Sequence, residues 1–283
     1  MRNNKKWYKL VFKQIQPIHV GAGSYGVINE TRIFIPGWTM WGALTKAYNL
    51  KNEKALSENH DVFENISCFY PCFNEDGNDV LFPKFEKGKF YLGNYSEDEF
   101  RAKFVDTFIS TAIDSRTNTA IDESLHELNI ILPGVKADYL EDEKEIQLYW
   151  VGIVQLENKD DLPDEIYIGG DARYGLGKMK LVKKDDIGES LPDDWKIKDG
   201  VLTNYFPVEA YCNTPQDSKI ELPVEIVNSW QKADLQVKLR EEDEEKGFFY
   251  VPGSKFNNTD SSSIKSIKKG VFTKEQTSER GGA

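Results

Sequence analysis

The sequence predicts an α+β fold, and three stretches near the start of the chain support this. Residues 7–20 alternate apolar and polar side chains, which is the period of a half-buried strand. Residues 27–35 form a second extended stretch rich in β-branched residues, and Pro36-Gly37 ends it. From Thr39, in the position of an N-cap, apolar residues recur at helical spacing. The order is therefore strand, glycine-rich turn, strand and helix.

The rest of the chain divides by composition. Two extended arms with a polar stretch between them predict a long projecting hairpin, and a later glycine loop lies between two apolar runs. We expect the following units: a main domain over 1–183, with an irregular insertion at 55–103 and the hairpin at 104–145; an acidic linker at 184–200; a small C-terminal unit at 201–256; and a flexible tail at 257–283.

Composition limits the class of protein. The 283 residues, 39% of them hydrophobic, suffice for a core, and no run of apolar residues is long enough to span a membrane. Without a secretion signal, the expected location is the cytoplasm. Its three cysteines, Cys68, Cys72 and Cys212, fit a reducing compartment, and His60 is the only further ligand near the first two, so we predict no metal site and no cofactor.

Charge is spread unevenly along a chain whose net charge is -11. Residues 1–54 carry nine basic against two acidic side chains, and residues 254–283 carry six against three, so the middle is strongly acidic. Because a polyanion feels mainly the local field, a basic face of an acidic protein is able to bind RNA. Solvated surface lysines explain the same pattern equally well.

Two glycine motifs resemble nucleotide-binding signatures but lack their context. Residues 21–26 match G-x-G-x-x-G, yet a β-branched stretch and Pro36 follow where a dinucleotide site needs a helix. Gly170 and Gly175 have the spacing of a P-loop, but Leu176 stands where a lysine is required. Neither nucleotide-cofactor binding nor nucleotide hydrolysis is supported.

Two segments have the chemistry of a phosphate site. In the glycine loop, Gly169, Gly170, Gly175 and Gly177 surround Arg173, and Lys178 and Lys180 follow. Glycines let a ligand approach the backbone, and arginine offers a planar fork for phosphate, although an ordinary long turn is an equal alternative. The helix start after Pro36 offers free N–H groups, with Lys46 nearby and with Trp38 and Trp41 either stacking on bases or lying in the core.

The ordered motifs resemble the RAMP subunits of type III CRISPR complexes. The resemblance covers residues 8–182 and rests on five segments: His19-Val20-Gly21 with its glycine turn, Ile35-Pro36-Gly37 before a helix, residues 112–120, Pro133-Gly134, and Gly169-Gly170 with Gly175-Leu176-Gly177. It implies a modified ferredoxin-like, or RRM-like, domain with an inserted thumb hairpin, to which the chain adds the smaller C-terminal unit expected from its composition. Pro252-Gly253-Ser254 after an aromatic strand echoes residues 34–37 and suggests a second, degenerate unit.

The resemblance also implies a function in antiviral defence. The chain would be a structural subunit that binds guide RNA (crRNA) and lies beside target RNA, the other RAMP subunits and the large subunit. The residues expected to contact RNA are His19, Gly21, Gly37, Trp38, Thr39, Trp41, Lys46, Arg116, Gly169, Gly170, Arg173, Tyr174, Gly175, Gly177 and Lys178.

Asn29 is the main departure from the family pattern. Cleaving relatives carry an aspartate where Asn29 aligns, and an amide neither accepts a proton nor binds a divalent ion strongly. We therefore predict no catalytic residue. Two alternatives remain: a metal-assisted endoribonuclease that uses Asp114, Asp61 or another carboxylate, and an unrelated ferredoxin-like enzyme or binding module.

Overall fold

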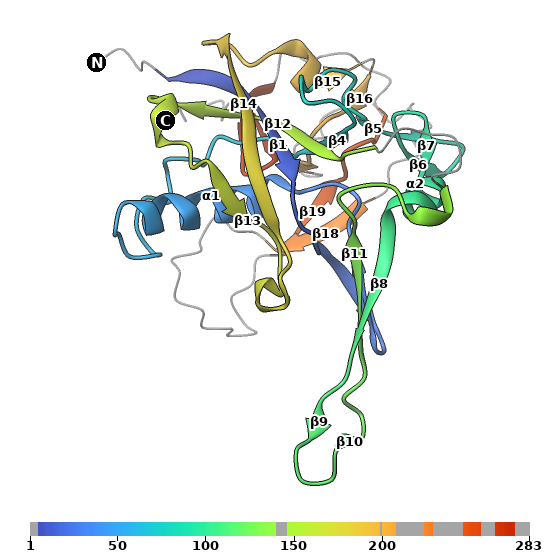
Figure 1. Cartoon of the computed structure of the whole chain (residues 1–283). Coiled ribbons are helices and arrows are strands. Elements are labelled where there is room, and N and C mark those ends of the chain that lie inside the picture. Colours follow the sequence, from blue (N-terminus) through green and yellow to red (C-terminus); the bar gives the residue numbers. More distant parts are fainter. Residues whose placement is uncertain are drawn as a thin grey trace, which may run out of the picture.

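The computed structural model shows a mixed α/β protein built mostly of strands (Figure 1). It describes residues 5–139, 146–198, 200–207, 224–228, 246–255 and 264–274. Cys212 and much of the predicted C-terminal unit and tail lie outside this part. Within the described part there are two α-helices, and neither is long and apolar enough to cross a membrane.

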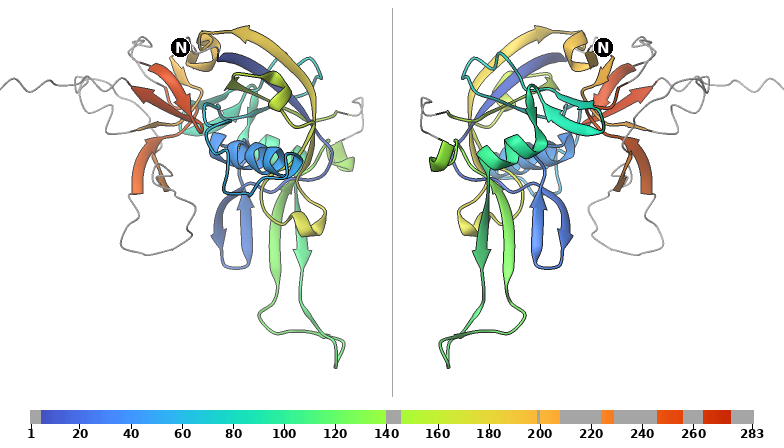
Figure 2. Two further views of the ribbon diagram at one scale, coloured as in Figure 1. Left: turned by 90° about the vertical axis from the view of Figure 1, so that its left-hand side faces the viewer. Right: turned by 90° about the vertical axis from the view of Figure 1, so that its right-hand side faces the viewer.

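A five-stranded sheet forms the centre of the molecule. Its order is β13 (Glu165–Tyr167), β14 (Lys178–Gly188), β1 (Lys6–Gln14), β12 (Tyr149–Leu156) and β4 (Tyr70–Cys72). The predicted first strand is thus the central strand, antiparallel to both of its neighbours. Helix α1 (Gly37–Lys51) lies across one face of this sheet (Figure 2).

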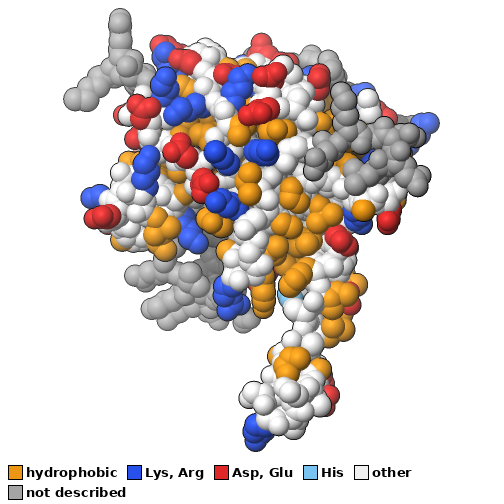
Figure 3. All heavy atoms as spheres, viewed as in Figure 1, with side chains coloured by type: hydrophobic (Ala, Val, Ile, Leu, Met, Phe, Trp, Pro, Cys, Tyr) orange, Lys and Arg blue, Asp and Glu red, His pale blue; other side chains and the backbone are white. Residues whose placement is uncertain are grey.

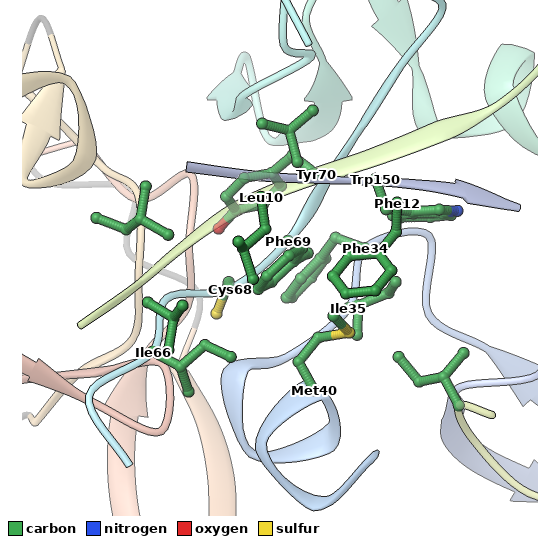
Figure 4. Packing of buried hydrophobic residues seen from close by; sticks show 14 of the residues in the cluster. Leu10, Phe12, Phe34, Ile35, Met40, Ile66, Cys68, Phe69, Tyr70 and Trp150 are labelled. Atoms are coloured by element: carbon green, nitrogen blue, oxygen red, sulfur yellow. The ribbon is translucent and has the colours of Figure 1, made fainter. Parts of the chain in front are cut away.

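The core lies between α1 and the sheet, as Figure 4 shows. Leu10 and Phe12 of β1, Trp150 of β12 and Met40 of α1 are fully buried there. Trp150 donates its indole N–H to the side chain of Gln14 at 2.9 Å, which satisfies both buried polar groups. One face of β1 therefore packs toward the helix, while Trp7 and Val11 on the opposite face are buried as well.

A second sheet extends away from the core. Its order is β2 (Gly21–Tyr25), β3 (Ile28–Thr31), β11 (His126–Ile131) and β8 (Val105–Ser110). Strands β8 and β11 continue into β9 (Ile113–Asp114) and β10 (Thr119–Ala120), forming the projecting hairpin, residues 105–131, that reaches far beyond the body of the molecule (Figure 1). The extended arms expected around 108–113 and 130–135 correspond in part to this hairpin.

Two expectations about local structure need correction. The glycine-rich segment at 21–26 is mostly a strand, and the turn is restricted to Gly26, with φ of 62°, and Val27. Helix α1 begins at Gly37 with Pro36 as its N-cap, so Thr39 is inside the helix and does not cap it. Proline suits a helix start because its fixed φ and missing N–H cost nothing there.

The segment expected to be an irregular insertion, residues 55–103, contains regular structure. It contributes β4 to the central sheet, and a small sheet and a second helix to one end of the molecule. Pro71 is tolerated in β4 because this strand is at the sheet edge. Helix α2 starts with a capping box between Ser96 and Glu99. The small sheet and helix are β5 (Pro83–Glu86), β6 (Lys89–Leu92), β7 (Tyr95–Ser96) and α2 (Glu97–Phe104).

The C-terminal part also differs from expectation. Strand β14 continues to Gly188, so the expected linker at 184–200 begins inside the central sheet. Buried Leu202, Tyr205 and Phe272 belong to the same hydrophobic cluster as β1, because the C-terminal strands pack onto the main domain rather than forming a separate core. These strands are β15 (Ile197–Lys198), β16 (Val201–Leu202), β17 (Phe206–Pro207), β18 (Val224–Asn228), β19 (Lys246–Tyr250), β20 (Ile264–Lys268) and β21 (Val271–Lys274).

Strands β20 and β21 form a hairpin within the expected flexible tail. We call residues 264–274 the C-terminal hairpin. Ile264, Ile267 and Phe272 are buried in the main core, which explains why this Ser- and Lys-rich segment is ordered. Apolar residues at only a few positions are sufficient to dock a two-stranded element onto an existing core.

Gly152→Ala is expected to destabilise the protein. A Cβ at Gly152 would clash with the ring of fully buried Phe69, and overpacking of a core costs about 1–3 kcal/mol. Gly42→Ala in α1 is the control: its Cβ would meet nothing within 4 Å, and alanine favours a helix over glycine by about 1 kcal/mol. Urea denaturation should lower the free energy of unfolding for the first variant and raise it for the second; the same sign for both would contradict the described packing.

Candidate nucleic-acid interface

Three segments project from the same side of the central sheet (Figures 1 and 2). They are the β2–β3 hairpin, the projecting hairpin and the glycine loop, residues 169–177, which contains the short 3-10 helix η3 (Ala172–Tyr174). Sequence reasoning named residues in all three. The structure brings these segments together around one short piece of chain.

That piece is the junction segment, residues 17–20, which leads from β1 to β2. Ile18 exchanges two backbone hydrogen bonds with Ile131 of β11, at 3.0 and 2.8 Å. The carbonyl of Pro17 accepts from Gly177 N–H at 2.9 Å. The junction segment therefore holds the projecting hairpin and the glycine loop at once.

His19 belongs to this junction rather than to an open surface. Its side chain is only 8% exposed, and its Nδ1 lies 2.8 Å from the carbonyl oxygen of Asn129. A Cβ at Gly169 would clash with the His19 carbonyl, so the loop approaches His19 as closely as glycine allows. His19 was predicted to contact RNA; in the structure its contacts instead position β11 and the glycine loop, which belong to the predicted site.

A small apolar cluster fixes the glycine loop against the projecting hairpin. Leu176 packs with Leu128 and Ile130 of β11, separately from the main core. The ring of Tyr174 lies 5.7 Å from the ring of Phe108 on β8 and remains 49% exposed. The ring of Tyr174 is therefore fixed by its contact with Phe108 and still accessible to a ligand.

The glycines of the loop have different structural roles. Gly169, Gly175 and Gly177 all have positive φ, of 76°, 78° and 97°. A Cβ at Gly177 would lie 2.5 Å from the Ile168 carbonyl oxygen, whereas one at Gly175 would meet nothing within 4 Å. Gly177 is thus needed for packing, and Gly175 keeps an open approach to the backbone.

The cations of the loop also differ. Arg173 is exposed and contacts only the ring of its neighbour Tyr174, at 5.9 Å, among the described charged and aromatic groups. Lys178 forms an ion pair with Glu165 at 3.0 Å, and the hydrogen bond to this carboxylate raises the pKa of Lys178. Arg173 is therefore the loop cation available to a phosphate.

Asn29 lies in a hydrogen-bonded group that includes a residue missed by sequence reasoning. Its Oδ1 accepts from Ser24 at 2.6 Å, and its Nδ2 lies 3.2 Å from Nδ1 of His126. The contact exists because β3 and β11 pair in parallel, with Asn29 opposite Leu128 and His126 two residues earlier on the same face.

The helix start that was predicted to hold phosphate is covered by the chain itself. Gly37 is buried, and a Cβ at Gly270 of the C-terminal hairpin would lie 2.7 Å from the Gly37 nitrogen. Backbone hydrogen bonds from Lys269 to Glu64, at 2.8 Å, and from Gly270 to Ile66, at 2.7 Å, hold the hairpin there. The predicted contact of Gly37 with RNA does not fit this packing.

The tryptophans of α1 pack against protein groups. Trp38 lies 4.8 Å from the ring of Tyr205, and Trp41, 9% exposed, donates to the His60 carbonyl at 2.7 Å. The ammonium of Lys269 lies 3.8 Å from the centre of the Trp41 ring, and burial lowers the pKa of Lys269. The alternative of a core position therefore describes both tryptophans better than base stacking does.

The remaining predicted residues are dispersed. Thr39 is half-buried in α1, Lys46 is exposed about two turns further on, and Arg116 is exposed at the tip of the projecting hairpin, 3.6 Å from Asp114. Gly21 and Gly170 are exposed beside His19. Arg116 is far along the hairpin from the glycine loop (Figure 1).

The described residues contain no group of three or more metal-ligating side chains. Cys68 is fully buried, and burial raises the pKa of its thiol to about 12. A thiol that stays protonated is a poor metal ligand and a poor nucleophile. Both Cys68 and Cys72 are free and buried in the core.

Exposed apolar side chains follow the projecting segments. Tyr25, Val27 and Ile28 are exposed on the β2–β3 hairpin, and hydrophobic side chains extend along the projecting hairpin in Figure 3. On that hairpin, the exposed large residues are Ile109, Ile113, Ile121 and Leu125. Surfaces of this kind on long projections are typical of binding sites.

Comparison with known proteins identifies the fold. No family model matches the chain, and no curated protein matches it. It is similar to a chain of the type III-B Cmr-beta complex bound to cognate target RNA, solved by cryo-electron microscopy, with 16% identity and a TM-score of 0.53, covering 87% of this chain and 85% of that one. In the same complex bound to target RNA and AMPPnP, state 1, the identity is 14%, the TM-score is 0.51, and the coverage is 87% and 84%.

Alanine substitutions in the glycine loop should show which glycine is needed for packing and which faces open space. Gly169→Ala is expected to lower the melting temperature clearly, because both its positive φ and the His19 carbonyl oppose a side chain. Gly175→Ala keeps the strained φ, about 1 kcal/mol, but has open space. Differential scanning calorimetry of both variants checks this, and equal losses of melting temperature would contradict the described loop.

Proposed function

We propose that this chain is a guide-RNA-binding structural subunit of a type III CRISPR ribonucleoprotein, with the modified ferredoxin-like domain of the RAMP superfamily. The observation that carries the proposal is the convergence of the β2–β3 hairpin, the projecting hairpin and the glycine loop around residues 17–20. A likeness in fold to chains of an RNA-bound type III-B complex supports it.

The proposed RNA contacts are those left accessible by this arrangement. Arg173 supplies charge, Tyr174 supplies an aromatic face, and the open backbone at Gly175 supplies close approach. Stacking on aromatic side chains together with cationic contacts to the backbone is the usual way to hold single-stranded RNA. In the proposal, the long projecting hairpin lies beside the paired guide and target, and neighbouring subunits and the large subunit complete the particle.

The proposed role is binding without cleavage at Asn29. The amide is engaged with Ser24 and His126, and it carries no charge. General-base chemistry or strong binding of a divalent ion would need a carboxylate at this point.

Arg173→Ala is expected to weaken binding of the guide RNA and to lower its salt dependence. One phosphate contact to a single strand contributes about 0.7 to the slope of log affinity against log salt. The measurement is a filter-binding titration of the full chain at several salt concentrations. Lys89→Ala, which removes an exposed lysine from β6, should leave the slope unchanged; an unchanged slope for Arg173→Ala would remove this side chain from the interface.

Asn29→Asp tests whether the chain lacks only the catalytic group. In an assembled complex with labelled target RNA, wild type and Asn29→Ala should give no cut at the position that this subunit covers. A new cut only with Asn29→Asp would support a cleavage site that has lost its carboxylate. A wild-type cut that survives in Asn29→Ala would contradict the scaffold role, because another carboxylate would then be responsible.

A further inference from the structure

The outer face of the central sheet is open beside the glycine loop. In the strand register, Lys13 of β1 is opposite Lys180 of β14, which is opposite Glu165 of β13. Residues opposite each other, or two apart along a strand, share a face. The lysine face is therefore made of Lys13, Ile15, Glu165, Tyr167, Lys178 and Lys180.

Helix α1 does not cover this face. The intervening residues Gln14, Ile166 and Met179 point the other way and are fully buried under the side that α1 covers. On the lysine face, Ile15 is 41% exposed and Tyr167 is 49% exposed. Figure 3 shows lysine and arginine side chains interspersed with acidic ones along the front of the molecule over β14.

The charges on the lysine face are not balanced within the described part of the chain. Neither Lys13 nor Lys180 has an acidic partner within 4 Å there, and Glu165, the carboxylate among the six residues of the lysine face, forms an ion pair with Lys178 at 3.0 Å. Like charges directly opposite on neighbouring strands destabilise a sheet. A bound anion would offset this cost.

The lysine face is continuous with the glycine loop at one end and closed at the other. Tyr167 precedes Gly169 by two residues, and Lys178 directly follows Gly177, so the loop with Arg173 connects the two strands that carry most of this face. Further along β1, the turn at Gly77 packs over Val11 and Lys9, since a Cβ there would lie 2.5 Å from Val11 Cγ2. A ligand on the lysine face would therefore reach it from the glycine loop.

We propose that the lysine face binds the phosphates of a single-stranded RNA segment that continues from the glycine loop, with Lys13 and Lys180 as phosphate contacts and Tyr167 as a stacking surface. The inference rests on the proposed RNA-binding function and extends its site onto the central sheet. RNA fits better than an acidic protein surface because cations and an exposed aromatic ring follow one another along a single path from Arg173.

The test is binding of a labelled, unstructured oligouridine RNA to the full chain as a function of salt. The double variant Lys13→Ala/Lys180→Ala should lose about 1.4 from the slope and roughly tenfold in affinity near physiological salt, because two single-strand phosphate contacts are removed. Glu165→Gln should strengthen binding, since it frees Lys178. The matched control Lys54→Ala/Lys89→Ala removes two exposed lysines elsewhere and should change the slope little.

The outcomes separate this inference from the proposed function. If the double variant keeps the wild-type slope while Arg173→Ala lowers it, the lysine face does not bind RNA, although the proposed function stands. If neither variant changes the slope, both fail. If the double variant binds RNA normally but no longer assembles with its neighbouring subunits, the face docks a protein and the inference is overturned.

Discussion

The backbone pairing between the junction segment and strand β11 is the constraint on which the rest of the candidate site depends. Ile18 and Ile131 exchange two hydrogen bonds, and the side-chain amide of Gln14 donates to the Ile131 carbonyl at 2.8 Å. Because Gln14 also accepts from Trp150 in the core, the projecting hairpin is tied directly to the centre of the main sheet. Buried hydrogen bonds of this kind are costly to leave unmade, so they fix one arrangement.

The same segment sets the position of the glycine loop. Pro17 accepts from Gly177, and Gly169 packs on the His19 carbonyl, so both ends of the loop meet the junction segment. Between these ends, Arg173 and Tyr174 stay exposed on a support that has little freedom. A rigid backbone with accessible cationic and aromatic side chains loses little entropy when it binds a strand.

Sequence patterns predicted the features that are set by residues close together in the chain. They missed the contacts between residues far apart in the chain. Alternation predicted β1, and the spaced glycines marked the loop, because period and backbone freedom are local properties. The covering of Gly37 by Gly270 joins segments at opposite ends of the chain, and nothing near either glycine signals it. His126 was missed for the same reason, since its contact with Asn29 depends on a parallel pairing of β3 with β11. From the sequence, Trp41 was able either to stack on bases or to lie in the core. Its contacts with Lys269 and with the His60 carbonyl favour the core position.

The most direct test of the account is a map of RNA–protein crosslinks. The full chain, purified with its neighbouring subunits and its bound RNA, would be irradiated with ultraviolet light and digested, and the crosslinked peptides would be identified by mass spectrometry. The account predicts crosslinks in the glycine loop, at Tyr174 and its neighbours, to small RNAs that share a common 5′ repeat. Crosslinks confined to the covered start of α1, or purification without any small RNA, would contradict it.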